Sequence, residues 1–200
     1  MPAEYPIAKS KTALLVIDAQ KVYSSTESPL CCKDFSAAIK NINALSAKMR
    51  EMGSPVVVIK HIYKEDKSDV GRIGDFGIDG LWNETNVLSQ YDDALIIDDS
   101  DIQISKTRYS AFVGTGLEET LKNKGVDTLI VTGFMTQFCV TSTTRHGADL
   151  DFKVITPSDA NDGPDLPDVP IAVTKQALNV AWGIAVADTT DTEKLLERMK

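Results

Sequence analysis

Cys139 lies where a predicted strand turns into a predicted helix. Residues 128–140 read TLIVTGFMTQFCV, with β-branched residues first, a glycine next and the cysteine near the helix start. Backbone N–H groups at a helix start are unpaired and partly positive, so they favour a thiolate and can bind an oxyanion. The position therefore predicts a nucleophile. The alternative is a small buried residue without chemistry, which is the commoner role of a lone cysteine.

Asp18 and Lys106 are two further residues suited to this chemistry. Asp18 ends the apolar run 13–17, and Lys106 follows the apolar run 94–97 after a short polar connection. Ligands of open α/β sheets bind beyond the carboxyl ends of the strands, so we expect the three side chains at one edge. A carboxylate can accept the thiol proton, and an ammonium favours both anions. Singly, each is more typical of a turn or a solvated lysine.

Short apolar runs alternate with helical periodicity along the chain. Runs typical of strands buried on both faces are residues 13–17, 55–59, 94–97, 128–132, 153–155 and 184–187. Helical spacing occurs at residues 35–52, 116–124, 138–150, 171–181 and 190–199. The pattern predicts an α/β fold with three α-β-α layers, Rossmann-like, in which helices cover both faces of a six-stranded, mostly parallel sheet.

Length and charge narrow the possible partners. A chain of 200 residues with 42% hydrophobic content fits one domain over residues 1–200. A net charge of -8 without a run of Lys or Arg argues against nucleic acid and anionic membranes, and favours a small-molecule substrate. The chain has neither a signal-like start nor a membrane-length apolar run, so we expect a cytoplasmic protein, although unconventional secretion would leave no mark. Its three cysteines form neither a disulfide framework nor a metal spacing.

Two long polar segments, 63–91 and 157–170, are expected to form loops over the carboxyl edge of the sheet. Aromatic residues near that edge are candidates for the walls of a substrate pocket. The candidates are Tyr23, Trp82, Tyr109 and Phe138, with Phe112 either in the pocket or in the core. Gln20 is expected to bind a substrate amide or to cap the turn after Asp18, and Arg108 either binds an acid group or is solvated.

Four blocks of the sequence resemble the isochorismatase-like cysteine hydrolases, and the resemblance extends over nearly the whole chain. The blocks are ALLVIDAQ at 13–20, KTRYSAF at 106–112, VTGFMTQFCV at 131–140 and DA at 159–160. The resemblance implies a six-stranded parallel sheet, with Asp18 as general base, Lys106 as charge partner and Cys139 as nucleophile. It also implies a cis peptide bond at Phe134-Met135, with the N–H groups of Met135 and Cys139 as oxyanion donors. A dimer or tetramer is expected from the same resemblance.

Members of this family differ in the substrate that they cleave and in whether they hold a metal. Members that cleave isochorismate commonly lack the cysteine, whereas amidase members keep it, so Cys139 favours attack on a carbonyl or amidine carbon. Nicotinamidase members hold a metal with an Asp and two His residues after the second strand. Here only His61 lies in that stretch, and the chain's other histidine, His146, lies in the predicted helix after Cys139. We therefore expect no metal and no cofactor, and expect His61 to be a polar residue at a strand end.

The leading hypothesis is a metal-independent cysteine hydrolase that cleaves a C–N bond of a small amide or ureide through a covalent intermediate on Cys139. One alternative is isochorismate hydrolysis, in which Asp18 protonates the vinyl ether and Cys139 is a bystander. Another is a catalytically silent interaction or effector protein. The three reactive residues favour an enzyme, and no Gly-x-Gly-x-x-Gly follows the first strand to support dinucleotide binding.

Overall fold

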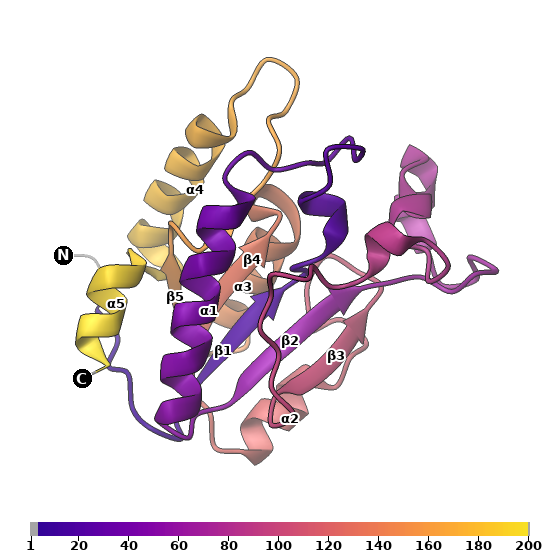
Figure 1. The fold of residues 1–200 in the computed structure, drawn as a ribbon. Coiled ribbons are helices and arrows are strands. Elements are labelled where there is room, and N and C mark those ends of the chain that lie inside the picture. Colours follow the sequence, from indigo (N-terminus) through magenta and orange to yellow (C-terminus); the bar gives the residue numbers. More distant parts are fainter. Residues whose placement is uncertain (1–3, 200) are drawn as a thin grey trace.

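The computed structural model describes residues 4–199, which form a parallel β-sheet covered by helices on both faces (Figure 1). The sheet order is β3-β2-β1-β4-β5-β7, every pairing is parallel, and the short β6 pairs with the end of β4. The strands are β1 (Thr12–Ile17), β2 (Val56–His61), β3 (Ile102–Lys106), β4 (Thr128–Phe134), β5 (Lys153–Pro157), β6 (Asn161–Asp162) and β7 (Asp188–Thr190). The predicted three-layer α/β fold is confirmed.

Within residues 4–199, five α-helices surround the sheet (Figure 1). They are α1 (Phe35–Glu51), α2 (Leu117–Asn123), α3 (Thr141–Asp149), α4 (Ile171–Ala185) and α5 (Thr192–Arg198). Successive side chains of β1 point to opposite faces, as strand geometry requires. Leu14 and Val16 pack in the core on the side of α1 and α5, whereas Leu15 packs with residues of α2 and with Trp182 of α4.

The third strand lies later in the chain than predicted. Residues 94–97 are irregular, and β3 begins at Ile102. In β3 the half-buried Ile102 and Ile104 alternate with exposed residues, and only Lys106 is fully buried. This pattern is typical of an edge strand with one solvent-exposed face. A search for continuous apolar runs overlooks such a strand. Lys106 is therefore the last residue of a strand and does not follow a connection.

The predicted strand at residues 184–187 is also wrong. Helix α4 continues to Ala185, and the last strand is the polar segment Asp188–Thr190. Ala, Ile and Val occur in both kinds of element, and here they continue the helix. The side chain of Trp182 is buried in the core, whereas Val180 is 60% exposed.

The long segment between β2 and β3 is mostly irregular, with three short 3-10 turns. The turns are Gly71–Phe76, Asp79–Trp82 and Val87–Ser89. Residues from the first two turns reach the carboxyl edge of the sheet, as the cavity described below shows. None of the helices within residues 4–199 has the length and apolarity that crossing a bilayer requires.

Candidate active site

Four neighbouring strands each bring one reactive side chain to the carboxyl edge of the sheet. Along the order β3-β2-β1-β4, Lys106 ends β3, His61 ends β2, Asp18 follows β1, and Cys139 lies in the π-helical turn after β4. Lys106 and His61 are direct neighbours in the β2–β3 register. All four side chains are buried. The topology thus brings residues that are far apart in the sequence into one cluster.

Gly133 allows β4 to approach β1 closely beside this cluster. Its φ is 116°, and a Cβ there would clash with the backbone of Ile17. Only glycine fits such an approach. Asp18 itself has a positive φ of 50°, a conformation that Asp adopts more readily than most residues. The backbone therefore turns sharply where the carboxylate enters the site.

The Lys106 ammonium is the centre of the cluster. Its Nζ lies 2.8 Å from Asp18 Oδ2, 3.2 Å from Cys139 Sγ and 3.2 Å from His61 Nδ1. It also donates to the carbonyl oxygen of Arg108 at 3.0 Å. The three protons of the ammonium match its three hydrogen bonds, to Cys139, His61 and Arg108, and the contact with Asp18 is an ion pair. Lys106 is held in place by contacts that leave no donor to spare.

Burial and charge set the protonation of the catalytic candidates. Burial raises the pKa of the Asp18 carboxyl above its usual value, although the Lys106 ammonium acts in the opposite direction. Burial alone would lower the pKa of Lys106, but Asp18 and Cys139 raise it by more. Asp18 and Lys106 therefore form a buried ion pair in which the carboxylate is more basic than an exposed one.

Burial also raises the pKa of the Cys139 thiol to about 12, with Lys106 opposing the shift and Asp18 adding to it. In this resting site desolvation outweighs the charge of Lys106. The thiol is neutral at physiological pH. A carboxylate oxygen of Asp18 lies within 4.8 Å of the sulfur, close enough to receive its proton once the site rearranges around a substrate.

His61 is a residue of the site that the sequence analysis underestimated. Because an ammonium can only donate, His61 Nδ1 accepts from Lys106, and Nε2 carries the proton that it donates to the Tyr63 hydroxyl at 2.6 Å. Its ring stacks on Trp82 with centroids 5.3 Å apart. Burial, together with Lys106 and Arg108, lowers its pKa well below the usual value. The feature of the sequence that indicated a place in the cluster for His61 was its position at the end of a predicted strand.

Gln20, expected to bind a substrate amide or to cap the turn after Asp18, and Tyr23, expected to contact substrate, are not among the residues that line the cavity described below. The buried Gln20 amide accepts from the His61 N–H at 2.9 Å and donates to the His61 carbonyl oxygen at 2.8 Å and to the Ser89 carbonyl oxygen. It thus fixes the end of β2 and does not line the cavity. Tyr23 packs in the core, stacked on Phe134. Both positions depend on the turn after Asp18, which sequence periodicity does not resolve.

A mostly apolar cavity opens beside the Cys139 sulfur. Its volume is about 30 Å³, close to that of a single water molecule, and a wider hollow of about 300 Å³ includes the open mouth. Its lining consists of His61, Ile73, Ile78, Trp82, Tyr109, Met135, Phe138 and Cys139. Trp82, Tyr109 and Phe138 are thus placed as the sequence analysis expected, while their contact with substrate stays a prediction. Phe112 lies in the core.

The peptide bond Phe134-Met135 is cis, as the resemblance implied. Within residues 4–199 no backbone carbonyl accepts a hydrogen bond from the Met135 N–H. The roles of the Met135 and Cys139 N–H groups as oxyanion donors stay predictions.

Arg108 supports the loop that covers the cavity. Its Nη1 donates to the carbonyl oxygens of Asp69 at 2.9 Å and Val70 at 3.4 Å. Its guanidinium also packs so closely on Gly71 that a side chain there would clash. The pairing was not predictable, because the acceptors are main-chain atoms of a distant loop.

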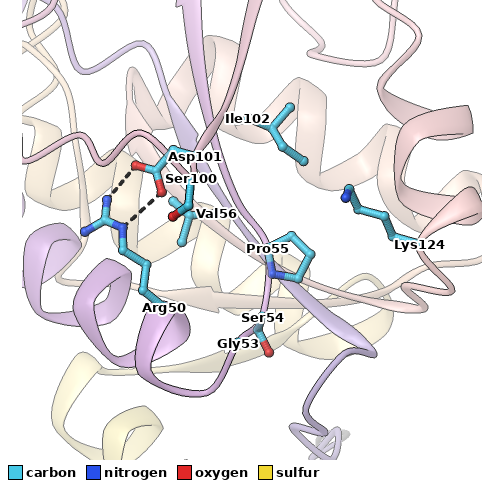
Figure 2. A pocket seen from close by; sticks show the side chains of 9 residues that line it. All are labelled: Arg50, Gly53, Ser54, Pro55, Val56, Ser100, Asp101, Ile102 and Lys124. Atoms are coloured by element: carbon cyan, nitrogen blue, oxygen red, sulfur yellow. Dashed lines mark hydrogen bonds and ion pairs between the residues drawn. The ribbon is translucent and has the colours of Figure 1, made fainter.

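A second hollow lies at the opposite, amino edge of the sheet (Figure 2). In this hollow, Arg50 donates hydrogen bonds to both carboxylate oxygens of Asp101, at 2.9 and 2.6 Å. This pair neutralises the guanidinium. None of Asp18, His61, Lys106 and Cys139 lines this hollow, whereas His61 and Cys139 line the cavity at the carboxyl edge.

Comparison with known proteins agrees with this geometry. The isochorismatase domain model matches residues 12–188. The chain belongs to the isochorismatase family. The match runs from the first residue of β1 to the first residue of β7, so it includes all four strands that carry the reactive side chains.

The isochorismatase-family relatives include amidohydrolases. The chain is 28% identical to the ureidoacrylate amidohydrolase RutB of Pseudomonas savastanoi pv. phaseolicola (strain 1448A / Race 6), over 82% of this chain and 76% of that protein. It is 30% identical to the N-carbamoylsarcosine amidase of Arthrobacter sp over 74% of this chain and 58% of that protein. The crystal structure of a cysteine hydrolase from Pseudomonas syringae pv. phaseolicola 1448A has a TM-score of 0.95 at 29% identity, covering 100% of this chain and 97% of that one. The chain is therefore a hydrolase of this family.

Asp18, His61 and Cys139 are also the one group of described residues whose ligand atoms, all within 4.8 Å of one another, resemble a metal site. The Lys106 ammonium lies within 3.2 Å of an atom of each of them. A divalent cation placed among these atoms would be repelled by that ammonium. The donor set therefore does not fit a metal while Lys106 is charged.

Proposed function

We propose that this isochorismatase-family hydrolase cleaves a C–N bond of a small amide or ureide through a covalent intermediate on Cys139, without a metal. The observation that carries the proposal is the position of the Cys139 sulfur, 3.2 Å from the Lys106 ammonium and within reach of Asp18, at the inner end of a cavity. The names of two relatives, a ureidoacrylate amidohydrolase and an N-carbamoylsarcosine amidase, support amide hydrolysis.

Acylation begins with attack of the sulfur on the carbonyl carbon. Because the pKa of the resting thiol is about 12, its proton passes to Asp18 as the S–C bond forms. The raised pKa of Asp18 makes it a suitable base. The carbonyl oxygen becomes an oxyanion, for which the Met135 and Cys139 N–H groups are the proposed donors.

Collapse of this intermediate completes the first half of the reaction. The C–N bond breaks, Asp18 returns the proton to the leaving nitrogen, and a thioester, or a carbamoyl thiol in the case of a ureide, remains on Cys139. Water then attacks the thioester carbon and gives a proton to Asp18. That proton returns to the sulfur as the S–C bond breaks, which releases the acid and restores the resting site.

Lys106 remains protonated throughout, in keeping with its raised pKa. Its charge stabilises Asp18 before the attack and the sulfur anion as it leaves. It transfers no proton in this scheme. Its position among several acceptors means that a compact ammonium, and not a planar guanidinium, fits the space.

The main alternative is isochorismate hydrolysis, with Asp18 as proton donor to a vinyl ether and no bond to Cys139. A catalytically silent binding protein would need none of these three groups together. The decisive experiment is turnover of a panel of amides, ureides and isochorismate, with ammonia release as the assay for amides and ureides, absorbance as the assay for isochorismate, and mass spectrometry of the quenched enzyme. An acyl adduct on Cys139 supports the proposal, whereas isochorismate turnover that survives Cys139→Ala contradicts it.

A further inference from the structure

We propose that the substrate of this site is uncharged, and that the group attached to its reacting carbonyl or urea unit is a small aliphatic or aromatic one. The inference rests on the proposed function, since it concerns the cavity beside Cys139.

The cavity walls offer little to a charged ligand. Ile73, Ile78, Trp82, Met135 and Phe138 supply apolar surface. The remaining lining residues are Tyr109, His61 and Cys139, and no lysine or arginine of residues 4–199 lines the cavity. A carboxylate buried without a cation or several hydrogen-bond donors is strongly unfavourable. A methyl, isopropyl or phenyl group gains from the same walls.

Lys106 and Arg108, the basic residues beside the cavity, do not line it. The Lys106 ammonium has no exposed surface and contacts Asp18, Cys139 and His61. Arg108 lies outside the lining and donates to main-chain oxygens of Asp69 and Val70. His61 accepts from Lys106 and is neutral, so it adds no positive charge. A bound anion would also meet the Asp18 carboxylate near the reacting carbon.

The mouth of the cavity continues the apolar surface. Ile78, Tyr109 and Phe138 are 39%, 36% and 37% exposed, although they are large apolar or aromatic residues. The rings of Tyr109 and Phe138 stack with centroids 5.8 Å apart. An apolar substituent entering from solvent can therefore exchange water contacts for ring contacts before it reaches the sulfur.

This substrate class differs from the compounds in the names of two relatives. Ureidoacrylate and N-carbamoylsarcosine each carry a carboxylate. We infer that the present site accepts the same carbamoyl or amide unit, with an apolar group in place of the acid. The substrate would then be a neutral primary amide or a neutral monosubstituted urea.

Matched pairs of compounds test the inference. Isobutylurea and N-carbamoylglycine differ by isopropyl against carboxylate, as do 4-methylpentanamide and succinamate. We expect kcat/KM, measured by ammonia release, to favour the neutral member of the pair that reacts by at least about 100-fold, as the cost of burying an unpaired carboxylate implies. Equal or faster turnover of the acids would overturn the inference.

A second readout does not need turnover. Iodoacetamide and iodoacetate alkylate the same sulfur but differ in charge, and peptide mass spectrometry isolates the Cys139 adduct from those of Cys31 and Cys32. We expect the rate ratio of iodoacetamide to iodoacetate at Cys139 to exceed that of free cysteine by at least about 10-fold. If no amide or ureide is hydrolysed, the proposed function fails while this ratio still decides the charge preference. A ratio at or below that of free cysteine contradicts the inference.

Two charge substitutions provide a matched control. Ile78→Lys introduces a cation at the cavity mouth, whereas Val87→Lys introduces the same charge at an exposed site outside the lining. Ile78→Lys should lower the iodoacetamide-to-iodoacetate ratio by about 10-fold, and Val87→Lys should leave it within about 2-fold of wild type. If wild type prefers anions and Arg108→Gln removes that preference, then Arg108 binds an acid group and the inference is wrong.

Discussion

The Lys106 ammonium lies 2.8 Å from the Asp18 carboxylate, and neither side chain has any exposed surface. Such a pair has lost the hydration of both charges, so each depends on the other. The Lys106 charge opposes the rise in the pKa of Asp18 that burial causes. The contact also means that single substitutions of the pair affect stability as well as catalysis.

Lys106→Met should slow alkylation of Cys139 at a given pH, because loss of the ammonium raises the pKa of the thiol further. The variant also leaves Asp18 buried without a partner, which should cost about 3–5 kcal/mol of unfolding free energy. The double variant Asp18→Asn/Lys106→Met should recover most of that loss. Rates of iodoacetamide labelling against pH and urea unfolding measure the two effects. Identical labelling profiles in Lys106→Met and wild type would contradict this role of Lys106.

Asp18→Asn should have the opposite effect on the thiol. The Asp18 carboxylate raises the pKa of Cys139, so its removal should shift alkylation of Cys139 to lower pH. Turnover should nevertheless fall by at least about 1000-fold, because the base is lost. The rate of Cys139 alkylation against pH and the turnover rate, measured on one preparation of the variant, check the two effects. A variant that labels at lower pH and still turns over substrate would show that Asp18 is not the base.

Cys139→Ala should abolish amide or ureide turnover while the fold stays intact. The substitution removes one buried sulfur atom, so we expect a loss of no more than about 2 kcal/mol in unfolding free energy. Circular dichroism and thermal unfolding verify the fold, and ammonia release measures activity. More than a few per cent of wild-type activity on the true substrate would exclude nucleophilic catalysis and favour the isochorismate reaction.

Burial of neutral His61 should make the protein less stable in mild acid. Its pKa is well below 6.5 in the folded state, so below pH 6.5 the unfolded chain binds a proton that the folded chain does not. Unfolding free energy should therefore fall as pH decreases from 6.5, by up to about 1.4 kcal/mol per pH unit from this residue. Urea unfolding of wild type and His61→Gln between about pH 6.5 and pH 5 checks the difference in slope. Parallel slopes would mean that His61 titrates normally.

Activity should survive exhaustive chelation. The Lys106 ammonium lies among the three side chains that would otherwise resemble ligands, and it contacts each of them. Assays after dialysis against a chelator, together with elemental analysis of the active protein, measure this directly. Loss of activity that one particular metal ion restores would contradict the proposed mechanism and the assignment of Lys106 as a permanent cation.

Sequence patterns predicted those parts of the site that depend on strand ends. Asp18 and Cys139 follow the central, fully buried strands β1 and β4, whose apolar runs are continuous. Lys106 was placed after the wrong segment because β3 is a half-exposed edge strand. The strand pattern still placed Lys106 at the carboxyl edge of the sheet, and its role as charge partner came from the resemblance.

The sequence did not predict the directions in which several side chains near the site point. Gln20 and Tyr23 lie near Asp18 in the chain, yet one binds the backbone of β2 and the other packs in the core. His61 was expected to be a polar residue at a strand end, and its pairing with Lys106 across β2 and β3 places it in the cluster. These outcomes depend on the pairing of distant strands and on the conformation of one turn, which single-sequence periodicity does not specify.

The delivery of one reactive group by each of four adjacent strands makes this enzyme sensitive to changes in chain length. Deletion of one residue within β1, β2, β3 or β4 would turn the side chains beyond it to the opposite face and shift them by about 3.3 Å. The sheet could still pair while the chemistry is lost. Insertions in the turn at residues 53–55, at the other edge, leave all four groups in place. Tolerance to insertion should therefore differ sharply between the two ends of the same sheet.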